Sequence, residues 1–186
     1  MNAINQMRTL RIFLARFSKA AGIMTTLPVV QFGASSVNIT IGYISKAPIS
    51  VNLINVLGDY ISQIFGIKAH LRFVRIENYY ADAHILAQYL SSLIGGSAQS
   101  SHTFKVAIRR LSRYIAFAAG HPNSAIGFKG LRVQISGRLA TEPTRPRQTV
   151  HVYEIGSFKS NRMQASSYTS TNPKGSITIK VWLGLL

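Results

Sequence analysis

The densest group of side chains that could bind or react lies in residues 105–113. Lys105, Arg109 and Arg113 are spaced four residues apart, and Arg110 stands beside them. In a helix this spacing places the cations along one side. The segment contains no Asp or Glu, so neighbouring ion pairs on the helix cannot balance its charge. A solvated helix face is the ordinary explanation for a run of charges, but the absence of counter-charges favours contact with phosphate groups.

Side chains of the types that catalyse reactions or bind metals are scattered through the chain. Only His84 lies on a clearly predicted helix, and it has no second His or carboxylate four residues later. Paired carboxylates, a nucleophile elbow and a Walker-type glycine loop are all absent from the sequence. The lack of cysteine excludes disulfides, thiolate zinc sites and cysteine nucleophiles. The sequence therefore predicts no enzyme, no metal site and no cofactor.

The charge balance of the chain indicates a polyanionic partner. Among 186 residues, 21 Lys and Arg stand against five Asp and Glu, which gives a formal charge of +16. Residues 1–100 carry eight cations and three anions, and residues 101–186 carry thirteen and two. We expect the second half to be the main binding surface, because phosphate-rich partners neutralise such charge. An acidic membrane surface is the other candidate partner, but it usually requires a strong amphipathic helix or a lipid anchor. No apolar run reaches the roughly 18 residues of a membrane span.

Apolar periodicity predicts the elements of the first half. Leu10, Phe13, Leu14 and Phe17 fall at helical spacing within residues 1–20. This acid-free, Arg-containing segment also resembles a mitochondrial transit peptide, but we favour a helix that is retained. The remaining expected elements are a strand at 36–44, a helix at 51–65 ended by Gly66, a strand at 68–76 and a helix at 81–94 ended by Gly95 and Gly96.

The second half is predicted to begin after a small, polar linker at 95–101. A helix at 103–118 follows, with an apolar stripe that includes Phe104 and Leu111 opposite the cations. The Ser/Thr-rich segment 157–175 is expected to be an extended strand or a loop. Strands are predicted at 130–136, 148–155 and 176–183.

Two segments of this second half carry a family resemblance. Residues 127–139, GFKGLRVQISGRL, resemble the glycine-lysine-glycine, strand, serine-glycine-arginine-leucine signature of ribosomal protein S-three, a head protein of the small subunit. Residues 175–183, GSITIKVWL, resemble the final strand of the same family. The two segments stand in the family's order and at its separation. Together they identify the chain as resembling a member of this family, and the degenerate KH loop described below fits an organellar form.

The resemblance implies an α+β fold in two domains. A degenerate type II KH-like domain would span 1–96, followed by a carboxy-terminal α/β domain at 97–186 with a mixed sheet packed on helices. The helix at 103–118 then corresponds to the family's linking helix, which lines the mRNA entry channel. Lys105 and Arg109 match two basic positions of that helix, whereas Val106 falls where another cation is usual. This departure puts the family's mRNA-unwinding role in doubt.

The expected function is that of a structural constituent of a small ribosomal subunit in the mitochondrial matrix, with the plastid as the second choice. The expected partners are small-subunit rRNA, mRNA and neighbouring ribosomal proteins, without a membrane or a small-molecule substrate. For Arg132, a covered strand face is as plausible as a phosphate contact. We expect mRNA to contact Lys105, Arg109, Arg110 and Arg113, and rRNA to contact Lys129, Arg132, Arg138, Arg145, Arg147 and Lys180.

One departure from the family concerns the KH clamp. A KH domain binds RNA backbone through a GxxG loop, because glycines let phosphates approach the chain closely. The matching place here reads Asn52-Leu53-Ile54-Asn55. We expect this degenerate loop to pack against protein. A free KH-like RNA-binding protein or RNA chaperone remains the alternative, although such a protein would depend on the clamp. A lysine-dependent lyase has only the family's extra-ribosomal activities in its favour.

Overall fold

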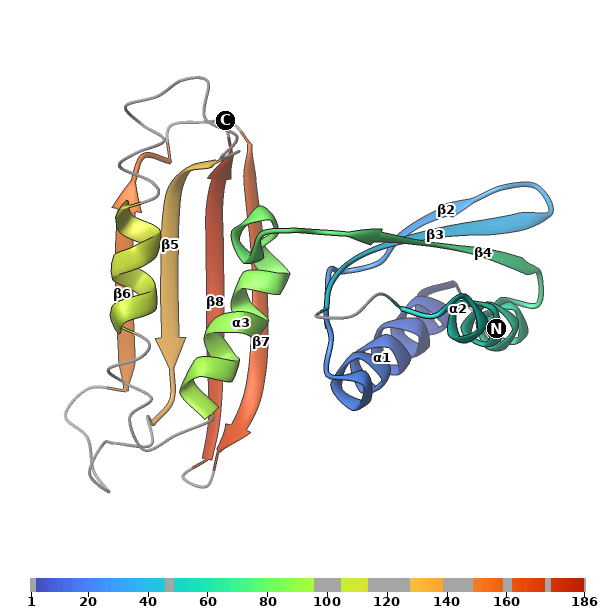
Figure 1. Ribbon diagram of the computed structural model, residues 1–186, viewed down its shortest axis with the longest axis horizontal. Coiled ribbons are helices and arrows are strands. Elements are labelled where there is room, and N and C mark those ends of the chain that lie inside the picture. The colour runs from blue at the N-terminus through green and yellow to red at the C-terminus, as the bar shows by residue number, and fades with distance from the viewer. Residues whose placement is uncertain are drawn as a thin grey trace. The chain divides into compact units, whose positions relative to one another are not determined.

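The computed structural model describes residues 3–45, 49–95, 105–113, 128–138, 149–158, 162–172 and 175–185. The chain divides into two compact units after Asn78 (Figure 1). The predicted boundary at 96/97 is therefore wrong by one helix. That helix, α3 (Ala83–Gly95), packs its apolar residues into the core of the second unit.

The amino-terminal unit places two helices on one face of a sheet (Figure 1). Its central strand, β3, pairs antiparallel with β1 and β2 and parallel with β4. The predicted helices and the strands at 36–44 and 68–76 are confirmed to within a few residues, whereas β1 and β2 were not predicted. The elements are α1 (Ala3–Ala21), β1 (Met24–Thr25), β2 (Val29–Phe32), β3 (Ser36–Ile44), α2 (Val51–Phe65) and β4 (Lys68–Arg75).

Strand alternation builds the core of this unit. Val37, Ile39 and Ile41 are fully buried on the helix-facing side of β3, as expected for alternate residues of a strand with one covered face. Leu10 of α1 and Ile61 of α2 are also fully buried and belong to the same cluster. Each of these large side chains contributes about 1.5–3 kcal/mol by leaving water, so both helices are fixed to the sheet.

The helix α2 ends where the sequence predicts. Gly66 adopts a left-handed conformation (φ 71°), and its N–H donates to the Ser62 carbonyl at 2.8 Å. Asn52 and Asn55 lie in the first turns of this helix rather than in a loop. The prediction of a degenerate KH loop at these residues is therefore wrong in its conformation, because the apolar period that buries Leu57 and Ile61 keeps the segment helical from Val51.

The carboxy-terminal unit is a four-stranded sheet in the order β6-β5-β8-β7. All three pairings are antiparallel, so the expected mixed sheet is wrong for this unit. The Ser/Thr-rich segment contributes β7, which pairs with the next strand from Asn172↔Gly175 onward. The elements are the short 3-10 helix η1 (Tyr79–Ala81), α3, a helix that includes residues 105–113, β5 (Phe128–Ser136), β6 (Val150–Gly156), β7 (Met163–Asn172) and β8 (Gly175–Leu185).

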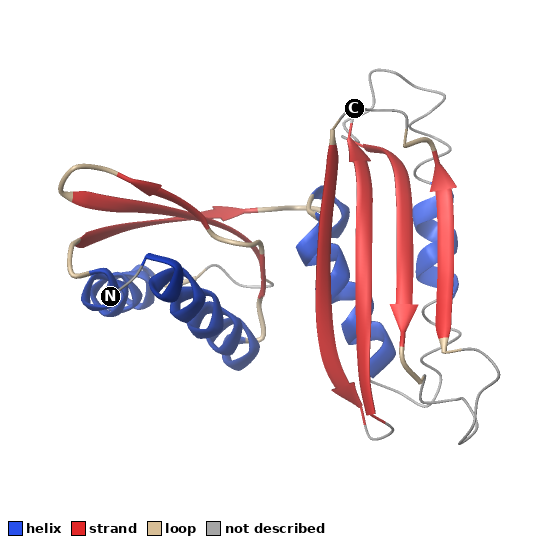
Figure 2. Cartoon of the chain, turned by 180° about the vertical axis from the view of Figure 1, so that it is seen from behind, coloured by secondary structure: helices blue, strands red, loops and turns tan. Residues whose placement is uncertain are grey.

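The helix α3 and the helix at 105–113 cover the same face of this sheet, which leaves the other face open in the described part of the chain (Figure 2). Alternate residues of β5 and β8 point into the covered side and are at most 1% exposed: Leu131, Val133, Ile135, Ile177, Ile179, Val181 and Leu183. Ala107, Ile108 and Leu111 complete this core from the helix at 105–113. The cationic side of that helix must therefore face away from the sheet.

A polar seam joins α3 to β7. The Asp82 carboxylate caps the helix by accepting the N–H groups of His84 (2.8 Å) and Ile85 (3.0 Å). Its second oxygen accepts a hydrogen bond of 2.6 Å from the Gln164 side-chain amide. Farther along, Ser91 donates to Ser170 at 2.7 Å. These bonds satisfy the polar inner face of β7, which explains why a strand with so few apolar residues is held in the fold.

This seam predicts a pH-dependent stability. His84 shares a hydrogen bond of 2.8 Å with the Ser166 hydroxyl, and burial lowers its pKa below the ordinary 6.5, although the Asp82 charge opposes that shift. The unfolded chain binds this proton more readily, so stability is full above pH 6.5 and falls as the pH drops below it.

We expect the free energy of unfolding of the carboxy-terminal unit to decrease on acidification from about pH 7.5 to about pH 5.5. The measurement is urea unfolding followed by the fluorescence of Trp182, the chain's single tryptophan. A His84→Gln variant should show a flatter profile over this range. An equally steep profile in that variant would assign the effect to other groups.

Candidate nucleic-acid interface

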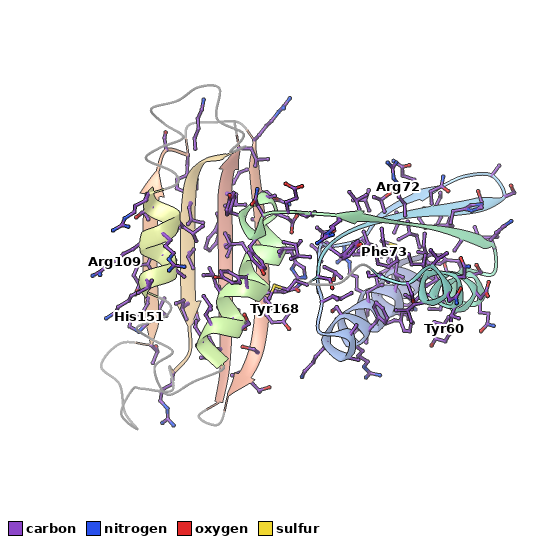
Figure 3. All side chains as sticks on the ribbon, in the orientation of Figure 1. Tyr60, Arg72, Phe73, Arg109, His151 and Tyr168 are labelled. Carbon is purple, nitrogen blue, oxygen red and sulfur yellow. The ribbon has the colours of Figure 1, made fainter. Side chains whose placement is uncertain are left out.

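The helix at 105–113 presents its cations to solvent. Lys105, Arg109, Arg110 and Arg113 are all exposed, and Figure 3 shows Arg109 pointing away from α3. None of them forms one of the ion pairs found within the described ranges. The cationic stripe expected from the sequence is therefore present as a surface. Phe104 lies outside the described residues.

The open face of the carboxy-terminal sheet forms a second polar surface. We define it by Arg132 and Gln134 of β5 and by Lys180 and Trp182 of β8. The register places Arg132 opposite Trp182 and Gln134 opposite Lys180 on neighbouring strands. Arg132 thus lies on the uncovered side of the sheet, and its side chain is 46% exposed. The sequence left open whether this strand face was covered, and the structure decides the question.

Arg132 is held in place on this open face by two neighbours. Its guanidinium lies 5.4 Å from the centre of the Trp182 ring, a cation–π contact worth about 0.5–1 kcal/mol at an exposed site. Its Nε is 3.9 Å from the Glu154 carboxylate, an exposed pair that contributes little. The planar group is therefore oriented while most of its hydrogen-bonding edge stays available. Trp182 was not predicted as a site residue, although alternation in the predicted strand 176–183 puts it on the same face as Lys180.

The remaining predicted rRNA-binding residues are not brought into one cluster. Lys129 is exposed on β5, and Arg138 is half-buried just after that strand. Arg145 and Arg147 lie outside the described residues. The described members of the predicted set therefore divide between the open face and the two opposite ends of β5.

The start of α2 has a different character from these cationic surfaces. Asn52 and Asn55 are exposed there, and they lie among apolar side chains that are also exposed, with Val51 at 70% and Val56 at 65%. Cations are missing from this part of the helix. Such a surface offers no charge to a phosphate backbone.

Two other kinds of site receive no support from the described residues. No group of three or more His, Asp or Glu in that part of the chain could hold a metal ion. None of its helices combines the length and apolar character needed to cross a membrane.

Comparisons with known proteins converge on one family. Residues 23–186 match the family model described as mitochondrial ribosomal protein (VAR1). The chain is also 30% identical over 141 residues to the small ribosomal subunit protein uS3m of Mycosarcoma maydis. That alignment covers 68% of this chain and 50% of the relative, so the chain spans about half the length of the curated protein that it matches.

Proposed function

Because the chain belongs to the VAR1 family of mitochondrial ribosomal proteins, we propose that it binds rRNA in the head of the small subunit and lines the mRNA entry channel. Its similarity to uS3m supports a mitochondrial member of the S3 family with a role in the small ribosomal subunit. The single observation that carries the finer proposal is the exposed cationic stripe of the helix at 105–113, which has no ion pair within the described part of the chain.

The mRNA contact is assigned to Lys105, Arg109, Arg110 and Arg113. Their helix is anchored by buried Ile108 and Leu111. The backbone that carries the four cations is therefore already ordered before a phosphate backbone binds. Val106 is half-buried, and its position lacks the cation that is usual in the family. We therefore propose contact with mRNA and not active unwinding.

The rRNA contact is assigned to the open face and the basic residues around β5. Arg132 and Lys180 stand on adjacent strands of the open face, where the oriented Arg132 guanidinium can donate to phosphate oxygens in a bidentate manner. Lys129, Arg138, Arg145 and Arg147 complete this proposed set. Phosphate contacts of this kind fix position without reading sequence, as a structural protein of the ribosome requires.

The amino-terminal unit is proposed to be a degenerate KH-like domain. Its parallel β3–α2–β4 arrangement supports this assignment. At the start of α2, exposed Val51 and Val56 replace a phosphate-binding loop. We therefore assign this helix start to contact with a neighbouring ribosomal protein.

The test of the proposed function is sedimentation of mitochondrial extracts. We expect most of the protein to co-sediment with small subunits through moderate salt, since several phosphate contacts must be lost before it dissociates. Immunodetection across a sucrose gradient measures the distribution. Finding the protein mainly in the free fractions would favour the alternative of a free RNA-binding protein or RNA chaperone.

A further inference from the structure

The helix α1 carries a second row of cations that the proposed function does not use. Arg8, Arg11, Arg16 and Lys19 are all exposed, and at 3.6 residues per turn they fall within an arc of roughly 140°. We call this group the α1 ridge. It belongs to the amino-terminal unit.

The opposite side of α1 is fixed to the unit. Leu10 is fully buried and Leu14 is 4% exposed, both within the core formed with β3. The Gln6 side-chain amide donates to the Ile64 carbonyl at 3.3 Å, and the centroids of the Phe13 and Tyr60 rings are 4.5 Å apart. The helix cannot turn its charges inward without losing these contacts, so the α1 ridge is a permanent surface.

The charges of the α1 ridge have no acidic partner among the residues that the structure describes. Residues 3–21 contain no Asp or Glu, and the described ion pair of the chain lies between Arg132 and Glu154 in the other unit. Arg8 and Arg11 stand three residues apart, as do Arg16 and Lys19, and like charges at this spacing repel each other. A polyanion bound along the ridge would remove that repulsion.

We propose that the α1 ridge binds the phosphate backbone of rRNA as a contact of the amino-terminal unit separate from any KH clamp. The proposal rests on the proposed function for its partner. An anionic membrane is the competing polyanion, but an interfacial helix must insert a broad apolar face. In α1, Leu10 and Leu14 are buried in the core, and the exposed large apolar residues are Ile4 and Ile12. The ridge also lies before residues 23–186, which match the family model. The proposed contact is therefore made by residues outside the matched part of the chain.

The test compares two triple variants of the full chain. The ridge variant carries Arg8→Gln, Arg11→Gln and Lys19→Gln, which remove charge and keep good helix formers. The control carries Lys68→Gln, Arg72→Gln and Arg75→Gln on β4, where all three cations are exposed in the same unit; Figure 3 shows Arg72 directed away from the helices. Circular dichroism confirms that both variants fold.

The measurement is the affinity for a transcript of the rRNA head domain as a function of salt. Each lost phosphate contact lowers the slope of log affinity against log salt by about 0.7–0.9. We expect the ridge variant to lose roughly 2–3 from this slope and the control to lose less than about 1. Replacing Arg8 and Arg11 with Lys should preserve the slope, because the charge is retained.

Equal losses in both triple variants would show that the charge acts diffusely and would overturn the inference. Unchanged RNA binding by the ridge variant, combined with lost binding to vesicles of anionic phospholipid, would overturn it in favour of a membrane. If the wild-type chain fails to bind the transcript or to sediment with small subunits, the proposed function itself fails. If the wild type passes both tests and the ridge variant matches the control, only the α1 ridge is rejected.

Discussion

Reversing the charge of the helix at 105–113 by the double substitution Arg109→Glu and Arg113→Glu is expected to weaken mRNA binding by assembled small subunits by roughly 10- to 100-fold. Both side chains are exposed on the outer side of a helix whose inner side is buried. The variant therefore replaces two attractions to phosphate with two repulsions and leaves the core intact. Filter binding of a labelled mRNA to purified subunits measures the loss.

The control for this prediction is Lys68→Glu with Arg72→Glu, an equal change of charge on exposed residues of β4. We expect it to leave mRNA binding within about threefold of the wild type, because those residues lie outside the proposed mRNA contact. Assembly is followed in parallel through the amount of each variant in the small-subunit peak. If assembly and mRNA binding decrease equally in the Arg109/Arg113 variant, these residues are rRNA anchors and do not line the entry channel.

Substituting Gly137 with Ala is expected to destabilise the carboxy-terminal unit by about 3–5 kcal/mol. Gly137 follows β5 with φ at +123°, a backbone conformation that L-residues rarely adopt. A Cβ atom there would lie 2.5 Å from the Ser176 carbonyl oxygen and 3.1 Å from the Ile177 Cα. Because both neighbours are backbone atoms of β8, relief of the clash must displace a central strand of the sheet.

Gly175 provides a matched control for this substitution. Its φ of +129° is nearly the same, but an added Cβ would meet no described atom within 4 Å. Gly175→Ala should therefore cost only the conformational strain, about 1–3 kcal/mol. Urea unfolding followed by Trp182 fluorescence reports on this unit for both variants. Equal losses would show that strain alone explains Gly137 and that the approach of β8 does not matter.

Local patterns were enough to predict most elements of this chain. Apolar residues alternate in 36–44 and 176–183, and they fall at helical spacing in 51–65. These patterns mark side chains that must be buried, and the structure has the strands β3 and β8 and the helix α2 at these places. Gly66 ends α2 in the structure, as the sequence predicts. The strands β1 and β2 were missed because they are only two and four residues long, too short for an apolar period to emerge.

Local patterns could not predict which of the two units α3 belongs to. Its apolar residues require a core, but their spacing does not say which of the two sheets supplies it. The structure places Leu86, Leu90 and Ile94 against the carboxy-terminal sheet, and the Gln164 and Ser166 side chains of β7 fix the start of the helix. These bonds join residues about 80 positions apart, which no local pattern contains.

By itself, the sequence determined the net charge of this protein and the types and local spacing of its side chains. A formal charge of +16, the stripe of Lys105, Arg109 and Arg113, and the absence of cysteine are properties of composition and short spacing. Tertiary structure decided which charges are available. Packing buries one side of each helix and one face of each sheet, so it turns the cations of 105–113 and α1 outward and leaves Arg132 and Lys180 on an open face. The direction in which each of these side chains points depends on contacts between residues that are distant in the sequence, and those contacts exist only in the folded chain.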